Sequence, residues 1–332
     1  FEARTQRPRP HLDDKIITAW NGLMISGLAR AGAALNEPKF IELASQAAQF
    51  LHDQLCAQPG KGLHRSWRDG ERGPKAFAMD YAALIHALID LYQAGLNVKW
   101  LQWAVALQSE MDTLFLDKDK GGYYSVHTDM AHSVLRIKED YDGAEPSPNS
   151  LAALNLARLS AMLDQQAYAD EAKKIITLFG TTLESNPSAV PMLVLAADFV
   201  HRGKQQIVLA GDAASPEFQA LLRVIHGRLL PTAVLLHVDG GSAQTWLGSH
   251  NEALVSMQPV NGQAAAYVCQ NYTCQKPVTD PAALEKLLDQ PVDKLGLRLG
   301  VIFSTSQCQT ILFSTGCLTL RGQFKLAFGQ PR

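Results

Sequence analysis

The sequence contains 332 residues, of which 47% are hydrophobic and 19% charged, and its formal net charge is −2. This composition is typical of a globular protein with a large core, in one large domain or two smaller ones. The near-neutral charge argues against nucleic acid or an anionic membrane surface as a partner. No membrane span is expected, because the longest apolar stretch, residues 16–35, is interrupted by Asn21, Ser26 and Arg30.

Three pairs of helices are predicted in the first part of the chain, and each pair combines two different patterns. Residues 15–35, 80–94 and 149–163 are apolar nearly all round, whereas residues 37–55, 99–117 and 164–184 are amphipathic. A helix that is apolar all round is buried, and an amphipathic helix lies at the surface. This alternation, repeated at a spacing of roughly 65 residues, is what concentric helices in an (α/α) toroid require. Stacked solenoids are the second alternative, because they give both helices of a pair a more similar character.

The connections within the pairs are short, whereas those between the pairs are long. Residues 58–79 join the first pair to the second, and residues 118–148 join the second to the third. The latter segment holds two strand-like runs, 121–126 and 133–137, which would form a hairpin on one rim. Long loops on a rigid scaffold are common places for binding residues.

After a further helix at residues 191–202, the pattern becomes that of a small α/β module. Strand-like runs are found at residues 206–210, 233–238 and 264–269, with a helix at residues 216–226. The last segment contains no Asp or Glu after residue 293, and we interpret it as strand, disordered tail or an artefact of how the sequence was defined. The prediction is a mainly α chain. It consists of a partial (α/α)6 toroid over residues 1–203, a small appended α/β module over residues 204–290 and an atypical tail over residues 291–332.

The cysteines and histidines indicate neither a disulfide framework nor a metal centre. The five cysteines are few and scattered, which favours a reducing compartment, the cytoplasm. Cys269 and Cys274 are four residues apart, and we favour two free thiols over a disulfide, and a disulfide over a metal site. No metal or other cofactor is expected. The sequence begins at Phe1 without a signal peptide, so we expect a fragment from which any targeting region is absent.

Polar residues gather at the starts of the three apolar helices. Inner helices of a toroid run in the same direction, so these groups should converge on one rim of the central cavity. Two carboxyl groups roughly 5–10 Å apart would there serve as the acid and base of sugar chemistry. The candidate catalytic residues are Asp13, Asp14, Asp80 and Glu145. The candidate substrate-binding residues are Trp20, Asn21, Tyr81, Tyr123, Tyr124, Asp142 and Asn149.

A structural interpretation of the same residues remains open. Asp and Asn at helix starts are ordinary N-caps, which stabilise a helix by about 1 kcal/mol each. Asp14, Asp80 and Asn149 fit that role, and Trp20 on a nearly all-apolar helix fits a core position. The functional interpretation is favoured by the expected meeting of all three groups on one rim.

Several of these runs resemble the spermatogenesis-associated protein 20 family, whose bacterial members are usually described as thioredoxin-domain-containing proteins. The matching runs are RPRPHLDDK at residues 7–15, AWNGLM at 19–24, DYA at 80–82, GGY at 121–123, DGAEPS at 142–147 followed by Asn149 and Ser150, and AYVC at 266–269 through PVTDP at 277–281. The resemblance implies an N-terminal thioredoxin-like domain followed by a six-hairpin, glycosidase-like toroid, with a fold similar to that of N-acylglucosamine epimerases. The thioredoxin-like domain and the first part of the toroid, with its His-Phe-Glu-Lys motif, are absent from this chain.

Three hypotheses about function follow. The first is a carbohydrate-active domain, a glycoside hydrolase or sugar epimerase, whose ligand is a sugar or another small molecule. The second is a non-catalytic scaffold or ligand-binding toroid that partners the family's thioredoxin-like domain in cis. The third is an inert fragment, because part of its ring is missing.

An open edge with exposed apolar inner helices also predicts only marginal stability for the isolated chain.

Overall fold

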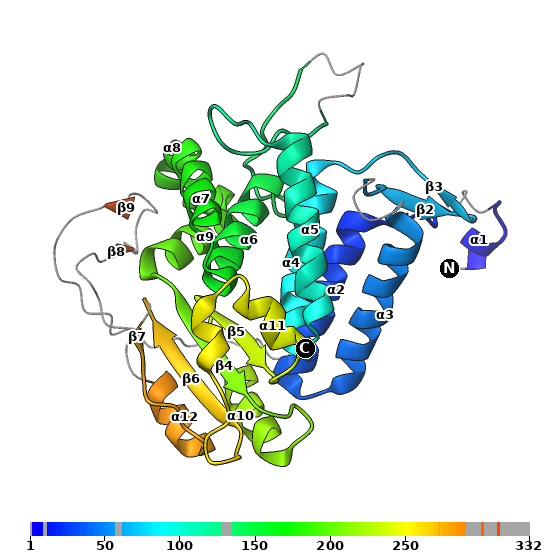
Figure 1. Ribbon diagram of the computed structural model, residues 1–332. Coiled ribbons are helices and arrows are strands. Elements are labelled where there is room, and N and C mark those ends of the chain that lie inside the picture. Colours follow the sequence, from blue (N-terminus) through cyan, green and yellow to red (C-terminus); the bar gives the residue numbers. More distant parts are fainter. Residues whose placement is uncertain are drawn as a thin grey trace, which may run out of the picture. The chain divides into compact units, whose positions relative to one another are not determined.

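The computed structural model describes residues 2–8, 12–56, 62–127, 135–271 and 273–289, together with two short strands farther on (Figure 1). Contacts divide the chain into two compact units, Phe1–Gln290 and Pro291–Arg332. In the second unit the described residues are the strands β8 (Gly300–Val301) and β9 (Ile311–Leu312), which pair antiparallel. The other residues of the predicted tail lie outside the described part of the chain.

The elements of the first unit follow in chain order. The helical part contains α1 (Glu2–Thr5), β1 (Ile16–Ile17), α2 (Thr18–Leu35), α3 (Pro38–Leu55), β2 (Ser66–Arg68), β3 (Glu71–Arg72), α4 (Ala78–Gly95), α5 (Val98–Phe115), α6 (Pro148–Leu163), α7 (Gln166–Leu178), α8 (Gly180–Ser185), η1 (Pro187–Ala189) and α9 (Pro191–Arg202). The α/β part contains β4 (Gln205–Ala210), α10 (Pro216–His226), β5 (Ala233–Val238), α11 (Ser242–Gly248), η2 (Glu252–Ser256), β6 (Ala265–Gln270), β7 (Thr273–Cys274) and α12 (Pro281–Leu288).

The helices form three antiparallel hairpins, α2–α3, α4–α5 and α6–α7, arranged as an arc. The apolar helices α2, α4 and α6 contact one another in that order, whereas α3, α5 and α7 contact mainly their own partners. α4 and α6 are buried along nearly their whole length, as their uniformly apolar sequences predict. The fold is therefore mainly α, with the concentric inner and outer helices of a partial (α/α) toroid.

Small residues bring α2 and α4 into close contact. A Cβ atom at Gly22 would lie 2.9 Å from the backbone carbonyl of Ala83. Only glycine therefore fits this position without a shift of one helix, and the close approach fixes the spacing of the inner row.

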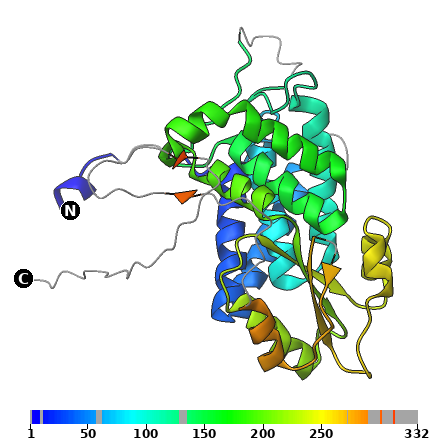
Figure 2. The same ribbon diagram turned by 90° about the vertical axis from the view of Figure 1, so that its left-hand side faces the viewer.

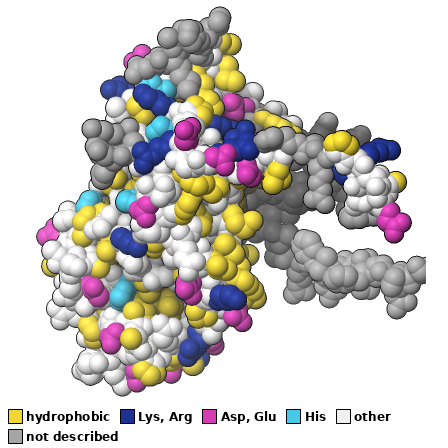
Figure 3. Space-filling view, turned by 90° about the vertical axis from the view of Figure 1, so that its right-hand side faces the viewer, with side chains coloured by type: hydrophobic (Ala, Val, Ile, Leu, Met, Phe, Trp, Pro, Cys, Tyr) yellow, Lys and Arg dark blue, Asp and Glu magenta, His cyan; other side chains and the backbone are white. Residues whose placement is uncertain are grey.

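One face of α2 differs from the other inner helices because it is exposed. Trp20 and Met24 retain 60% and 62% of their accessible surface, and Gly27 continues the same face one turn later. Apolar side chains are visible over the side of the molecule that carries α2 and α3 (Figure 3). Trp20 is thus not the core residue that the structural interpretation allowed.

The α/β module lies at the C-terminal ends of the inner helices (Figures 1 and 2). Its sheet has the order β5-β4-β6-β7, in which β4 and β5 are parallel and the other neighbours are antiparallel. Alternate residues of β4 face opposite sides: Ile207 and Leu209 pack with α10 and α12, and Val208 and Ala210 join the helical core. Tyr92 Oη of α4 accepts a hydrogen bond from the backbone of His237 in β5, which ties the module to the inner helices.

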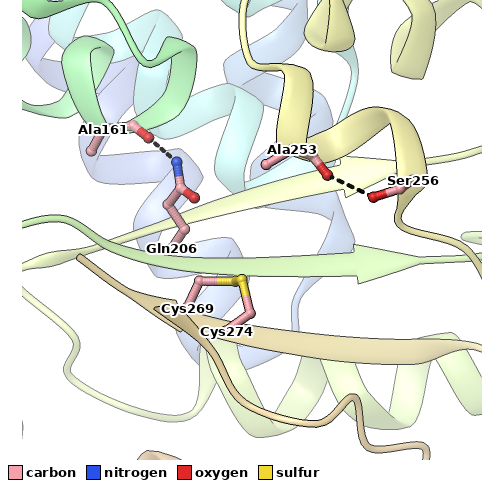
Figure 4. Close-up of a disulfide and its surroundings, with 6 residues drawn as sticks. All are labelled: Ala161, Gln206, Ala253, Ser256, Cys269 and Cys274. Atoms are coloured by element: carbon pink, nitrogen blue, oxygen red, sulfur yellow. Dashed lines mark hydrogen bonds between the residues drawn. A yellow bond between two sulfur atoms is a disulfide. The ribbon is translucent and has the colours of Figure 1, made fainter. Parts of the chain in front are cut away.

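The cysteine pair of the module differs from the prediction. Cys269 and Cys274 are joined by a disulfide, not present as free thiols (Figure 4). The cause is the register of the β6–β7 hairpin, which places these two residues directly opposite each other. Cys56 is free among the described cysteines.

The long connections are less regular than expected. Residues 58–79 contain the short β2–β3 hairpin, which also pairs with β1 ahead of α2. The predicted hairpin of residues 121–126 and 133–137 is not formed as strands in its described residues, although Ser125 N–H donates to the Ile137 carbonyl at 2.8 Å. Residues 133 and 134 lie outside the described part. Among the described helices, none combines the length and apolar character needed to span a membrane.

Candidate functional site at the starts of the inner helices

The starts of α2, α4 and α6 surround a cavity of about 1080 Å³, here called the rim cavity. α2 contributes the exposed face that begins with Trp20, and the segment before α6 contributes residues 143–148. Among the described residues, the lining consists of Ala19, Trp20, Leu23, Met24, Gly27, Arg65, Phe77, Met79, Ser125, Val126, Glu139, Tyr141, Gly143, Ala144, Glu145, Pro146, Ser147 and Pro148. Two of the predicted site residues, Trp20 and Glu145, therefore line one cavity.

Asp80 lies behind this cavity and has no solvent exposure. Its carboxylate accepts hydrogen bonds from the backbone N–H of Phe77 at 2.9 Å and of Ala19 at 3.1 Å. These donors belong to the first turns of α4 and α2, so one side chain caps two inner helices. Burial raises the pKa of Asp80 above its usual value, while these hydrogen bonds and Arg65 oppose the shift.

Arg65 is oriented by Asp80 and by an aromatic ring. Its Nη1 donates to Asp80 Oδ2 at 3.2 Å, and its guanidinium lies 4.9 Å from the centroid of Phe77. The side chain is only partly buried and lines the rim cavity. Asp80 thus holds the positively charged guanidinium of Arg65 in place at the cavity, although Asp80 itself does not line the cavity.

Asp142 and Asn149 hold the loop that carries Glu145. Asp142 accepts hydrogen bonds from the backbone of Ser147 and of Met192, both at 2.8 Å, and thereby caps α9. Asn149 accepts from Tyr123 N–H at 2.7 Å and donates to the carbonyls of Tyr123 and Glu139. The N-cap of α6 is Ser147, whose hydroxyl accepts from Ser150 N–H. Asp142 and Asn149 are both buried, so these groups position the loop.

The three predicted tyrosines do not line the rim cavity. Tyr81 is buried, and its Oη accepts a hydrogen bond from Leu63 N–H at 3.0 Å. Tyr123 is also buried and donates to Asp112 at 2.6 Å. Tyr124 donates to Asp117 at 2.8 Å, and the Arg136 guanidinium lies 4.0 Å from its ring.

The remaining predicted residues precede or begin α2. Asp13 pairs with Lys15 at 3.3 Å, and Asp14 pairs with Arg68 at 2.7 Å, both at the surface. Asn21 donates to the Ile17 carbonyl at 2.9 Å within its own first turn. None of these three residues is part of the cavity lining.

The lining also includes Arg65, Glu139 and Tyr141, whose polar side chains were not among the predicted site residues. Tyr141 is exposed and gives the same cavity a second exposed aromatic ring. Glu139 and Tyr141 lie just ahead of the DGAEPS motif, which occupies residues 142–147. Their position next to the motif was therefore a sequence signal for these two residues. Arg65 directly precedes β2, and no sequence signal pointed to it.

A second set of polar residues crosses the middle of the inner helices. Asp90 of α4 accepts hydrogen bonds from Arg158 of α6 and from Ser26 of α2, each at 2.5 Å. His86 lies 3.4 Å from Asp90 and 3.0 Å from Asn155 Oδ1. Burial alone would raise the pKa of Asp90, but Arg158, His86 and Arg30 outweigh it and lower the pKa to about 2.

The signal for this network was the scarcity of charges in the apolar helices: α6 has Arg158 alone, and α4 has only Asp80 and Asp90. Buried charges are almost always paired, and Asp90 and Arg158 lie in the middle of mainly apolar helices. Within the residues that the structure describes, no group of three His, Cys, Asp or Glu side chains is close enough to hold a metal ion.

Comparison with known proteins identifies close relatives over most of the chain. It is 37% identical to human spermatogenesis-associated protein 20 over 297 residues, which is 87% of this chain and 38% of that protein. The identity is 36% with the rat protein of the same name, at the same coverage. An uncharacterized protein of Caenorhabditis elegans is 32% identical, again over 87% of this chain and over 40% of its own length. The chain thus spans about two fifths of the length of the curated relatives it matches. No family model matches the sequence.

Similarity to solved structures is low. A cellobiose 2-epimerase from Bacillus thermoamylovorans has a TM-score of 0.45 and 14% identity, covering 80% of this chain and 68% of that one. A family 76 α-mannanase from Bacteroides thetaiotaomicron also has a TM-score of 0.45, with 13% identity and coverages of 66% and 59%.

Proposed function

The chain belongs to the spermatogenesis-associated protein 20 family, and we propose that its rim cavity binds a carbohydrate. The observation that carries this proposal is the exposed Trp20 ring in the wall of a cavity that also presents charged side chains. A sugar has apolar ring faces that pack on aromatic side chains and hydroxyl groups that hydrogen-bond at the edges. Sites for such ligands combine an apolar wall with a few placed polar groups.

The Arg65 side chain and the backbone at Glu139 are held in place before any ligand arrives. Asp80 and Phe77 fix the Arg65 guanidinium, and Asn149 holds the carbonyl of Glu139. Groups held in place lose little conformational entropy on binding, which favours affinity and selectivity. Arg65 would donate to sugar hydroxyls, and Glu139 and Glu145 would accept from them.

For chemistry on the bound sugar, Glu139 and Glu145 are the carboxylates that line the cavity within the described part of the chain. An epimerase or glycoside hydrolase would use them as acid and base. Both are exposed, and the enclosed carboxylate at this rim, Asp80, has both oxygens hydrogen-bonded to protein. This arrangement favours binding over catalysis and keeps the alternative of a ligand-binding domain that partners a thioredoxin-like domain.

The binding proposal is tested by calorimetric titration of the chain with hexoses and with α- and β-linked disaccharides. We expect saturable binding of at least one sugar, with a matching rise in melting temperature. Trp20→Ala should weaken that binding at least tenfold. Val255→Ala is the matched control, since Val255 is also exposed and apolar but lies in η2. The absence of binding across the panel, or equal affinity for the Trp20→Ala variant, would reject the proposal.

Catalysis is tested separately with the sugar that binds. If Glu139 and Glu145 act as acid and base, Glu145→Gln should retain affinity and lose turnover by at least a hundredfold. Glu42→Gln on the outer helix α3 is the control for the change in charge. Binding without turnover in the unaltered chain supports the ligand-binding alternative.

A further inference from the structure

A second cavity, of about 300 Å³, lies at the opposite ends of the inner helices and is here called the interior cavity. It is bounded by α2, α4, α6 and α9 and by the strand β5 and helix α10 of the α/β module. Gln93 fixes its floor, because its side chain accepts from Leu235 N–H at 2.8 Å and its carbonyl accepts from His226 at 3.0 Å. None of the proposed sugar-binding residues lines this cavity.

The charges around the interior cavity leave one positive group without a partner among the described residues. Asp90 is paired with Arg158 at 2.5 Å, and Arg228 is paired with Asp289 at 2.9 Å. Burial lowers the pKa of His86 and His226 below the usual value, so neither ring adds a charge near neutral pH. Arg30 of α2 is exposed, lines this cavity and has no ion pair or side-chain hydrogen bond within the described part of the chain.

The Arg30 guanidinium is close enough to the polar network to influence it. Its charge acts with Arg158 to lower the pKa of Asp90 and opposes protonation of His86. Arginine presents two parallel N–H donors, a geometry that matches a carboxylate. A monoanion would match the single unpaired charge. A dianion such as phosphate would place excess negative charge beside Asp90, which is costly in a partly desolvated site.

The rest of the wall is mainly aliphatic. Two helices and one strand contribute aliphatic side chains to this wall: Leu154 from α6, Leu195 from α9 and Val234 from β5. Such a wall favours an apolar body on the ligand, by about 0.8 kcal/mol for each buried methylene group. We propose that the interior cavity binds a small organic carboxylate, with its charged end on Arg30 and its aliphatic body against Leu154 and Leu195.

The proposal is tested by isothermal titration of the full chain with hexanoate at low ionic strength. Saturable one-to-one binding of hexanoate is expected. Hexanamide, which lacks the negative charge, and acetate, which lacks the aliphatic chain, should each bind at least tenfold more weakly. Arg30→Gln should reduce hexanoate affinity at least tenfold, whereas Arg30→Lys, which keeps the charge but not the paired donors, should lose less. Leu195→Ala should weaken hexanoate binding several-fold.

Arg223→Gln is the matched control, since Arg223 is an exposed arginine on α10 outside the cavity lining. It removes the same charge and should leave hexanoate affinity unchanged. Arg30 is exposed, so its variants should melt within a degree or two of the unaltered chain, which separates lost binding from lost folding. Equal affinity for hexanamide, an unchanged Arg30→Gln variant, or displacement of hexanoate by equimolar inorganic phosphate would each overturn the proposal.

Discussion

Asp80 in α4 accepts a hydrogen bond from the backbone N–H of Ala19 in α2, at 3.1 Å, across two neighbouring hairpins. The same carboxylate also accepts from Phe77 N–H in its own helix and from Arg65. Asp80 therefore resembles a local helix cap in the sequence, but its carboxylate links two inner helices and also holds Arg65 at the rim cavity.

Replacement of Asp80 by Ala should destabilise the chain by about 2–3 kcal/mol, because buried donors would be left unsatisfied. The measurement is the midpoint of urea unfolding. Asp119→Ala, at an exposed site, is the control and should change stability by no more than about 0.5 kcal/mol. A loss for Asp80→Ala as small as that of the control would contradict the role of Asp80 as a junction.

Substitution by alanine should have opposite effects on stability at two glycines of α2, Gly22 and Gly27. Gly22→Ala should destabilise by about 1–3 kcal/mol, because its Cβ would lie 2.9 Å from the backbone of Ala83. Gly27 has no atom within 4 Å of the position of an added Cβ. Gly27→Ala should stabilise the helix by about 0.5–1 kcal/mol. Thermal melts of the two variants compare the sites directly, and effects of the same sign would argue against the close approach of α2 and α4.

The ion pair of Asp90 and Arg158 should be strongly coupled. Arg158→Met alone leaves a buried carboxylate without its partner and should cost about 3–5 kcal/mol. Combining it with Asp90→Asn should recover part of that loss, because the uncompensated charge is removed. A double-mutant cycle of unfolding free energies measures the coupling. Strictly additive losses would show that the pair does not act as a unit.

The depressed pKa of Asp90 also predicts a pH dependence. The pKa is about 2 in the folded chain and about 3.9 in an unfolded one. The carboxylate therefore contributes stability above about pH 4, and that contribution is lost as the pH falls toward 2. The loss should be about 2–3 kcal/mol. The stability difference between the unaltered chain and Asp90→Asn should narrow between pH 5 and pH 2.5, and a constant difference would contradict this assignment.

The helical part of the fold could be predicted closely because its patterns are local. The six hairpin helices begin and end within a few residues of the predicted ranges, apart from a break at Phe179 that separates α7 from α8. Apolar residues repeat at helical spacing over several turns, so the signal is strong and independent of distant contacts. The exposed face of α2 does not follow from this local pattern but from the expected open edge of a partial ring, because it depends on which neighbours are present.

The candidate site could be predicted less well, and the reason lies in helix geometry. Tyr81 follows Asp80 directly, but successive residues on a helix point about 100° apart. Asp80 therefore faces α2, while Tyr81 faces Leu63 and Phe115. Position at a helix start pointed to an end of the inner helices where the structure has a cavity, yet it did not decide which side chains line that cavity.

The disulfide of the α/β module gives the last prediction. Cys269 and Cys274 close only a short loop between β6 and β7. By lowering the entropy of the unfolded chain, this cross-link should stabilise the folded state by only about 2 kcal/mol. Reduction with a thiol should therefore lower the melting temperature by about 3–6 °C. Cys274→Ser should melt near the reduced chain and show no response to reductant, which separates this bond from the other cysteines. An unchanged melt on reduction, or a variant that still responds, would show that the bond does not contribute to stability.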